Sequence, residues 1–82
     1  MELGNAIQKT LKDARKHSGL SQSDVAEQYG CSTQFISKLE NQSNDLSMSI
    51  LLKLADIYEL SPEGLMEQIL LRLRSLKEPL KK

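Results

Sequence analysis

The sequence is poor in cysteine, histidine and long apolar runs, and each shortage excludes a class of protein. One cysteine, Cys31, cannot form an internal disulfide, and with the single histidine it leaves too few ligands for an all-protein zinc site. The longest apolar runs, such as residues 69–71, are far shorter than the ~20 residues of a membrane-spanning helix, and the amino-terminal residues lack the apolar stretch of a secretory leader. We therefore expect a cytoplasmic protein with no metal, cofactor, small-molecule ligand or membrane partner.

The chain also lacks net charge, because eleven basic side chains balance eleven acidic ones over 82 residues. A nucleic-acid-binding protein is first expected to carry a basic excess. The balance is uneven, however: residues 1–19 hold four basic against two acidic side chains, residues 20–60 two against six, and residues 61–82 five against three. If the partner is DNA, this predicts few ionic phosphate contacts and a modest salt dependence of binding.

Apolar residues recur at helical spacing without strand-like alternation, which predicts an all-α fold. Residues 1–78 are expected to form one compact five-helix domain, and residues 79–82 a frayed tail. The expected helices run from Glu2 to Ser18, from the cap Ser21 to Gly30, from the cap Ser32 to about Asn41, from the cap Ser47 to near Tyr58, and from the cap Ser61 to about Lys77. Asp24 completes only an imperfect capping box with Ser21.

The second and third helices have the spacing of a helix-turn-helix unit. Ala26 is small where the next helix crosses close to it, and Gly30 permits the positive φ that reverses the chain. The apolar positions of the unit are Val25, Ala26, Tyr29, Cys31, Ile36 and Leu39. The alternative is a plain helical bundle in which these residues fall at such positions by chance. Cys31 is expected to be a small core residue in the turn, and the alternative for it is a redox-sensing thiol.

Over about residues 3 to 66 the chain resembles the phage repressor and Cro type of DNA-binding domain, the XRE family. The resemblance rests on residues 20–22, 25–26, 30–32, 36–41 and 61–65. The length, the asparagine-containing loop after the third helix and the leucine-rich last helix also resemble restriction-modification controller proteins. The resemblance implies a compact five-helix bundle with a helix-turn-helix at helices two and three, and a sequence-specific DNA-binding transcriptional regulator that is not an enzyme.

The resemblance also implies residue roles, with residues 33–41 as the recognition helix in the major groove. The base contacts would be Thr33, Gln34, Phe35, Ser37 and Lys38, and the DNA backbone contacts Gln22, Ser32, Asn41, Ser43, Asn44 and Met48. Gln34 can pair with adenine and Lys38 with guanine, while Phe35, expected outside the core, would meet thymine methyl groups. The alternative is that Gln34 and Lys38 are merely solvated surface residues.

Two further expectations come from the same resemblance. Arg15 and Glu40 should form a partly buried ion pair that ties the first helix to the third. Against the family pattern, the loop of residues 42–45 has neither a glycine nor a basic residue, which puts its backbone contacts in doubt.

The fifth helix has more apolar surface than one stripe of a small bundle needs, which predicts a homodimer on a pseudo-palindromic operator. Its expected interface residues are Leu65, Ile69, Leu70, Leu73 and Leu76. They could instead complete the core of a monomer.

The competing function is an antitoxin or other protein-interaction module on the same fold. An enzyme is disfavoured because His17 has no companion nucleophile and acid. The operator, the sign of regulation and the regulated genes are not specified by the sequence.

Overall fold

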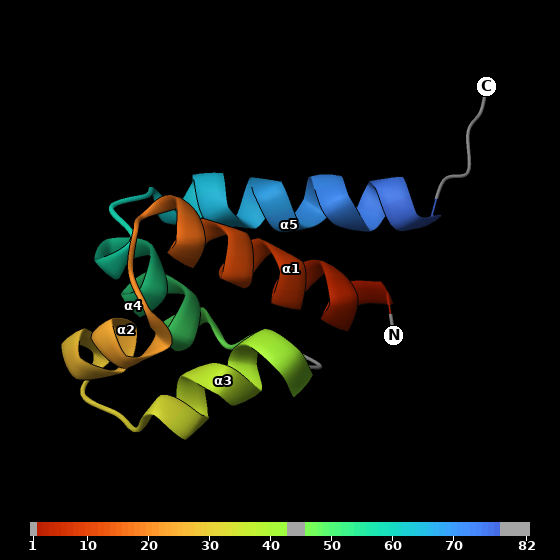
Figure 1. The fold of residues 1–82 in the computed structure, drawn as a ribbon. Coiled ribbons are helices and arrows are strands. Elements are labelled where there is room, and N and C mark those ends of the chain that lie inside the picture. Colours follow the sequence, from red (N-terminus) through yellow and green to blue (C-terminus); the bar gives the residue numbers. More distant parts are fainter. Residues whose placement is uncertain (1, 43–45, 78–82) are drawn as a thin grey trace.

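The computed structural model describes residues 2–42 and 46–77, which form five α-helices (Figure 1). Their bounds are α1 Glu2–His17, α2 Gln22–Tyr29, α3 Thr33–Gln42, α4 Met48–Ile57 and α5 Pro62–Lys77. The predicted all-α fold is confirmed, and each described helix begins and ends within one residue of its expected position. Gln42, expected in the loop, is the last residue of α3. The predicted tail of residues 79–82 lies outside the described residues.

Serine side chains cap four of these helices. The Ser21 hydroxyl accepts the Asp24 amide N–H at 3.0 Å, and the Asp24 carboxylate accepts the Ser21 amide N–H, also at 3.0 Å. The capping box that the sequence predicted as imperfect is therefore complete, because the shorter aspartate still reaches back to the cap. Ser32, Ser47 and Ser61 cap α3, α4 and α5 through bonds of 3.2, 3.2 and 2.9 Å to the amide three residues on.

Left-handed residues follow three of the helices, and the first of them is Gly19 after α1 with φ 76°. Gly30 follows α2 with φ 88°, and the Cys31 amide then donates to the Ala26 carbonyl at 3.0 Å. Glu59 follows α4 with φ 58° and is the only described non-glycine residue with a positive φ. There the Leu60 amide donates to the Ala55 carbonyl at 2.8 Å, the closing bond of a Schellman motif. The left-handed residue is thus a glycine after α1 and α2 and a strained glutamate after α4.

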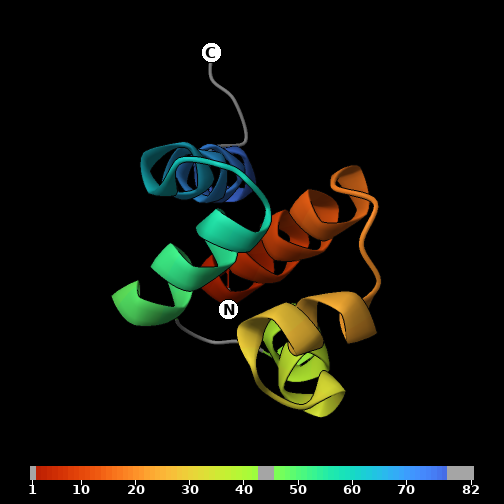
Figure 2. The ribbon, with the colours of Figure 1, turned by 90° about the vertical axis from the view of Figure 1, so that its left-hand side faces the viewer.

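The helices pack so that α1 lies between α5 and α3. α1 and α5 run side by side at the top of Figure 1, α3 lies at the bottom, and α2 and α4 close the end near the α4–α5 connection. Figure 2 shows the same order from the side, with α4 and the α1–α2 connection on opposite sides of the molecule. The buried core draws on all five helices: Ala6, Ile7, Leu11, Val25, Ala26, Ile36, Leu51, Leu54, Ala55, Tyr58, Leu65 and Ile69. No helix of the described chain has both the length and the apolar character to cross a membrane.

The apolar residues of α5 divide between this core and the surface. Leu65 and Ile69, expected at a dimer interface, are 0% and 3% exposed, so their own chain already covers them and that expectation is wrong for both. The reason is that α5 turns this stripe toward α1 and α4. Leu70 is 49% exposed and Leu73 is half-buried, whereas the side chain of Leu76 lies outside the described residues. Leu71, which the sequence prediction omitted, is 52% exposed.

Candidate functional site

α2 and α3 pack together around the turn at Gly30. Val25 and Ala26 of α2 and Ile36 of α3 are all buried, which brings the two helices into close contact. Cys31 fills the turn half-buried, and burial raises the pKa of its thiol, which favours the neutral form. α3 therefore lies along one edge of the molecule, held from its inner side (Figures 1 and 2).

The outer side of α3 carries most of the residues predicted to contact bases. Thr33, Gln34 and Lys38 are exposed, and Ser37 is half-buried. Ser32, Gln34, Phe35, Ser37 and Lys38 line an open hollow of about 560 Å³ along this side of the helix. The structure thus brings the predicted base-contacting residues together on one accessible surface at the amino-terminal half of α3.

Phe35 differs from the sequence prediction. It was expected outside the core, but its half-buried ring packs against the core cluster and against Tyr29, with ring centroids 5.6 Å apart. Lys53 of α4 covers the same Tyr29 ring at 4.3 Å and donates to the Tyr29 carbonyl at 3.1 Å. Phe35 therefore packs against Tyr29 of α2, and the uncovered part of its ring faces the outward hollow.

A network around Glu40 fixes α3 to α1 and α2. The predicted ion pair is present: Arg15 Nε donates to Glu40 Oε2 at 2.7 Å and Arg15 Nη2 to Oε1 at 3.2 Å. Hydrogen bonding to Glu40 raises the pKa of the Arg15 guanidinium above its ordinary value. Arg15 Nη1 also donates to the Leu20 carbonyl at 2.9 Å. Gln22 Nε2 donates to Glu40 Oε1 at 3.1 Å, so the carboxylate orients this side chain at the start of α2.

The carboxyl end of α3 contains a contact that the sequence prediction missed. Asn41 Nδ2 donates to the Ser37 carbonyl at 2.8 Å, and Lys12 Nζ donates to Asn41 Oδ1 at 3.4 Å. Lys12 of α1 therefore lies beside a predicted backbone-contacting residue. The three- and four-residue spacing of Lys9, Lys12 and Lys16 was the available signal, but only the packing of α1 on α3 relates that spacing to the site.

The remaining predicted backbone contacts lie at helix starts. Ser32 is exposed at the start of α3, with its hydroxyl accepting the Phe35 amide, and Met48 is 59% exposed at the first turn of α4. Amide N–H groups at such termini are ready donors to anions. Ser43 and Asn44 lie outside the described residues.

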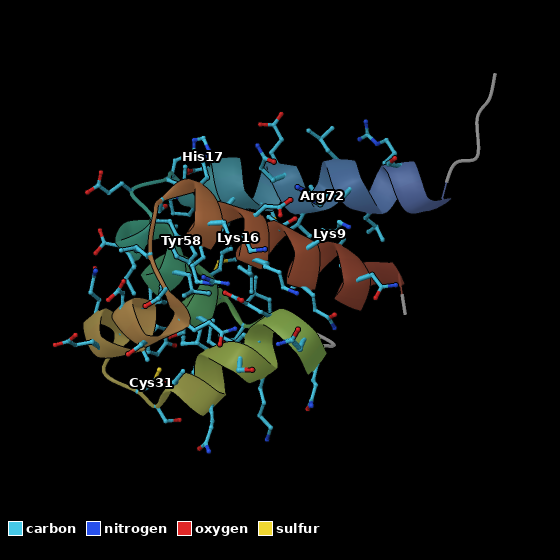
Figure 3. All side chains as sticks on the ribbon, in the orientation of Figure 1. Lys9, Lys16, His17, Cys31, Tyr58 and Arg72 are labelled. Carbon is cyan, nitrogen blue, oxygen red and sulfur yellow. The ribbon has the colours of Figure 1, made fainter. Side chains whose placement is uncertain are left out.

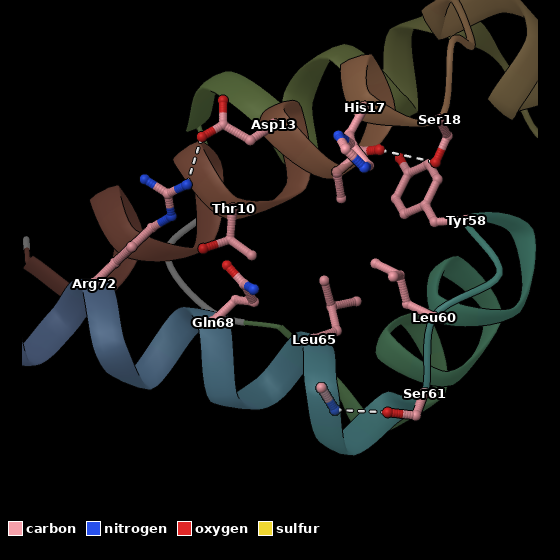
Figure 4. A pocket seen from close by; sticks show the side chains of 12 residues that line it. Thr10, Asp13, His17, Ser18, Tyr58, Leu60, Ser61, Leu65, Gln68 and Arg72 are labelled. Atoms are coloured by element: carbon pink, nitrogen blue, oxygen red, sulfur yellow. Dashed lines mark hydrogen bonds and ion pairs between the residues drawn. The ribbon is translucent and has the colours of Figure 1, made fainter.

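A second hollow, of about 430 Å³, lies between α1 and α5 (Figure 4). Asp13 and Arg72 form an ion pair at one end, and His17, Ser18 and Tyr58 lie at the other. The Ser18 hydroxyl donates to the Ala14 carbonyl at 2.9 Å, a bond within the last turn of α1. Burial raises the pKa of Tyr58 far above its ordinary value, so its hydroxyl stays protonated. This bond holds the Ser18 side chain against its own helix.

Comparison with known proteins finds likenesses in both sequence and fold. The family model described as Helix-turn-helix matches residues 11–65, more than half of the chain. Two solved structures of point mutants of the restriction-modification controller protein C.Esp1396I are similar to this chain, with TM-scores of 0.83 and 0.78. Their sequence identities are 22% and 23%, and each comparison covers 89% of this chain and 97% of the other. At that identity the likeness shows the fold. No curated protein matches the sequence.

Proposed function

This chain belongs to the helix-turn-helix family, and from that premise we propose that it is a transcriptional regulator that binds double-stranded DNA sequence-specifically. The observation that supports this proposal is the division of α3 into two sides. Ile36 and Glu40 hold its inner side at 1% and 2% exposure, while Gln34 and Lys38 are exposed on its outer side. A helix held in this way presents side chains from its amino-terminal half to the major groove.

Sequence would be read by hydrogen bonds from these exposed side chains. The Gln34 amide can pair with both N6 and N7 of adenine, and the Lys38 ammonium can donate to O6 and N7 of guanine. Thr33 and Ser37 add hydroxyl groups that suit either kind of edge. The outer part of the Phe35 ring is available for apolar contact with a thymine methyl group.

Contacts to the phosphate backbone would set the register of α3 in the groove. Gln22 is the best placed of these residues because its amide is already oriented by Glu40 at 3.1 Å. The other candidates lie close by. Ser32 precedes the start of α3, Asn41 is near its end, and Met48 begins α4. The Asn41 side chain already donates to Ser37 and accepts from Lys12, and the same side chain would make the contact to the DNA backbone.

We propose further that the protein binds a pseudo-palindromic operator as a homodimer through α5. Leu70 and Leu71 are about half exposed, and Leu73 is half-buried beside them. A twofold dimer would set two α3 helices one DNA turn apart, ~34 Å. Sedimentation equilibrium at tens of micromolar tests this: we expect twice the 9.2 kDa of the chain, reduced to one chain by Leu70→Glu. A 9.2 kDa particle for the free unsubstituted chain, together with a DNA complex that holds a single protein chain, would refute the dimer.

The DNA-binding proposal is tested by electrophoretic shift on duplexes from upstream of its own gene, compared with random duplexes. Gln34→Ala should cost ~1–3 kcal/mol on the preferred site and relax preference at one base pair. Gln22→Ala should weaken binding to all duplexes alike, and Gln28→Ala, an exposed change on α2, is the matched control. Equally weak binding to every sequence would refute the regulator and favour a protein-interaction module. Equal losses on both kinds of DNA for Gln34→Ala would break the base-reading assignment.

A further inference from the structure

Three lysines of α1 form a basic surface next to the recognition helix. Lys9, Lys12 and Lys16 are spaced three and four residues apart and therefore share one side of the helix. Figure 3 shows Lys9 and Lys16 along α1 with Arg72 on the neighbouring α5. Lys9 and Lys16 are exposed, and the half-buried Lys12 reaches Asn41 at the end of α3. We call Lys9, Lys12 and Lys16 the lysine face.

The charge of the lysine face is not balanced by the acidic residues around it. All three lysines line an open groove of about 670 Å³ between α1, α3 and α5. Two carboxylates also line this groove, but Glu40 is paired with Arg15 and Asp13 with Arg72. Among the side chains that the structure describes, the ion pairs are Arg15–Glu40 and Arg72–Asp13, and neither involves a lysine of the face. The groove therefore presents a net positive charge despite the zero total of the chain.

We propose that the lysine face binds the phosphate backbone of the DNA beside the groove that α3 occupies. This inference rests on the proposed function and deepens it. The Lys12–Asn41 contact makes the face continuous with the end of α3, and its charge complements phosphate. Seven residues of α1 span ~10 Å, while one DNA strand has a phosphate every ~3.4 Å along the helix axis, so the face can meet about three phosphates.

The consequence concerns how binding depends on salt. The composition alone predicts a modest salt slope, because the segment containing α2, α3 and α4 holds six acidic against two basic side chains. The lysine face supplies cations from α1 instead. Each phosphate that is neutralised contributes ~0.9 to the slope of log K against log salt concentration, on any sequence.

The test measures DNA affinity by fluorescence anisotropy between about 50 and 200 mM potassium chloride, on the preferred duplex and on a random one. The double variant Lys12→Gln, Lys16→Gln should lower the slope by ~1.8 per bound protomer on both duplexes, and leave their affinity ratio unchanged. Arg74→Gln removes the same kind of charge from an exposed position on α5 and should leave the slope unchanged. The double variant Lys12→Arg, Lys16→Arg should keep the slope of the original chain.

The outcomes separate this inference from the proposed function. Sequence-specific binding with the same slope in the glutamine double variant refutes the lysine face as a DNA surface, and leaves the regulator proposal intact. If Arg74→Gln lowers the salt slope by as much per charge removed as the glutamine double variant does, the effect is a general one of charge. That result also refutes the lysine face as a DNA surface. If the original chain prefers no sequence, the proposed function fails instead. Thermal melting by circular dichroism checks that the surface substitutions leave the fold in place.

Discussion

Replacing Glu40 by glutamine tests how α3 is held, because it keeps the size of the side chain and removes only its charge. Glu40 is 2% exposed and accepts three hydrogen bonds, two from Arg15 and one from Gln22. A glutamine retains one acceptor oxygen and turns an NH₂ group toward these donors. The Arg15 guanidinium, whose side chain is only 13% exposed, would then lie largely buried without a counter-charge.

The expected cost follows from this burial. Removing one partner of a buried ion pair costs ~3–5 kcal/mol, and the acceptor that glutamine keeps lowers the expected loss to about 2–4 kcal/mol. For a chain of this size each kcal/mol shifts the melting temperature by ~4–8 °C, so the variant should melt about 8–32 °C lower. Binding to DNA should weaken as well, since Gln22 loses the carboxylate that orients it.

Urea unfolding and thermal melting of the purified protein measure the effect. Asp13→Asn is the matched control, because it makes the same chemical change in an ion pair whose side chains are 53% and 32% exposed. An exposed pair contributes at most ~1 kcal/mol, so the control should lose far less. If Glu40→Gln and Asp13→Asn lose the same small amount, the argument that burial makes the Arg15–Glu40 pair important is refuted.

Three further predictions concern the local structure of the helix ends. Glu59→Gly should raise the free energy of unfolding by about 0.5–1 kcal/mol in urea titration, because it relieves the left-handed backbone at φ 58°; a loss of stability would contradict the strain. Gly30→Ala should cost ~1–2 kcal/mol through backbone strain alone, since an added Cβ meets nothing within 4 Å, and an unchanged midpoint would count against this. The Ser21 amide bond to Asp24 lowers the pKa of that carboxyl, so its stabilisation is present above its unfolded pKa and is lost as pH falls through the folded value. Between about pH 5 and pH 3 the free energy of unfolding should therefore fall more steeply for the original chain than for Asp24→Asn, and parallel curves would contradict the shift.

The helices and their ends were predictable because their causes lie within a few residues. A serine hydroxyl caps the amide three residues on, and Gly30 allows the left-handed turn, so the bounds of α2 and α3 can be located from neighbours in the chain. The Arg15–Glu40 pair was also expected, but on the strength of family resemblance rather than of local chemistry. The spacing of the two residues, 25 apart, contains no physical signal of their contact.

The places where the prediction failed involve packing between distant helices. The burial of Leu65 and Ile69 depends on which stripe of α5 meets α1, and two candidate stripes of leucines look alike in the sequence. Phe35 was expected outside the core, but its ring is half-buried, with its centroid 5.6 Å from that of Tyr29, while it still lines the outward hollow of α3. Side chains of similar hydrophobicity compete for the same space, and only the full set of contacts decides which are covered.

The sequence by itself thus determined five helices, their caps and the helix-turn-helix spacing, because hydrogen bonds and turns between near neighbours follow from residue type. The tertiary structure alone decided which charges act together. It neutralised Asp13 and Glu40 with arginines and brought Lys12 beside Asn41, which leaves a basic groove on a chain with no net charge. The physical reason is that Coulomb interactions depend on distance in space, whereas a sum over the sequence counts every charge equally.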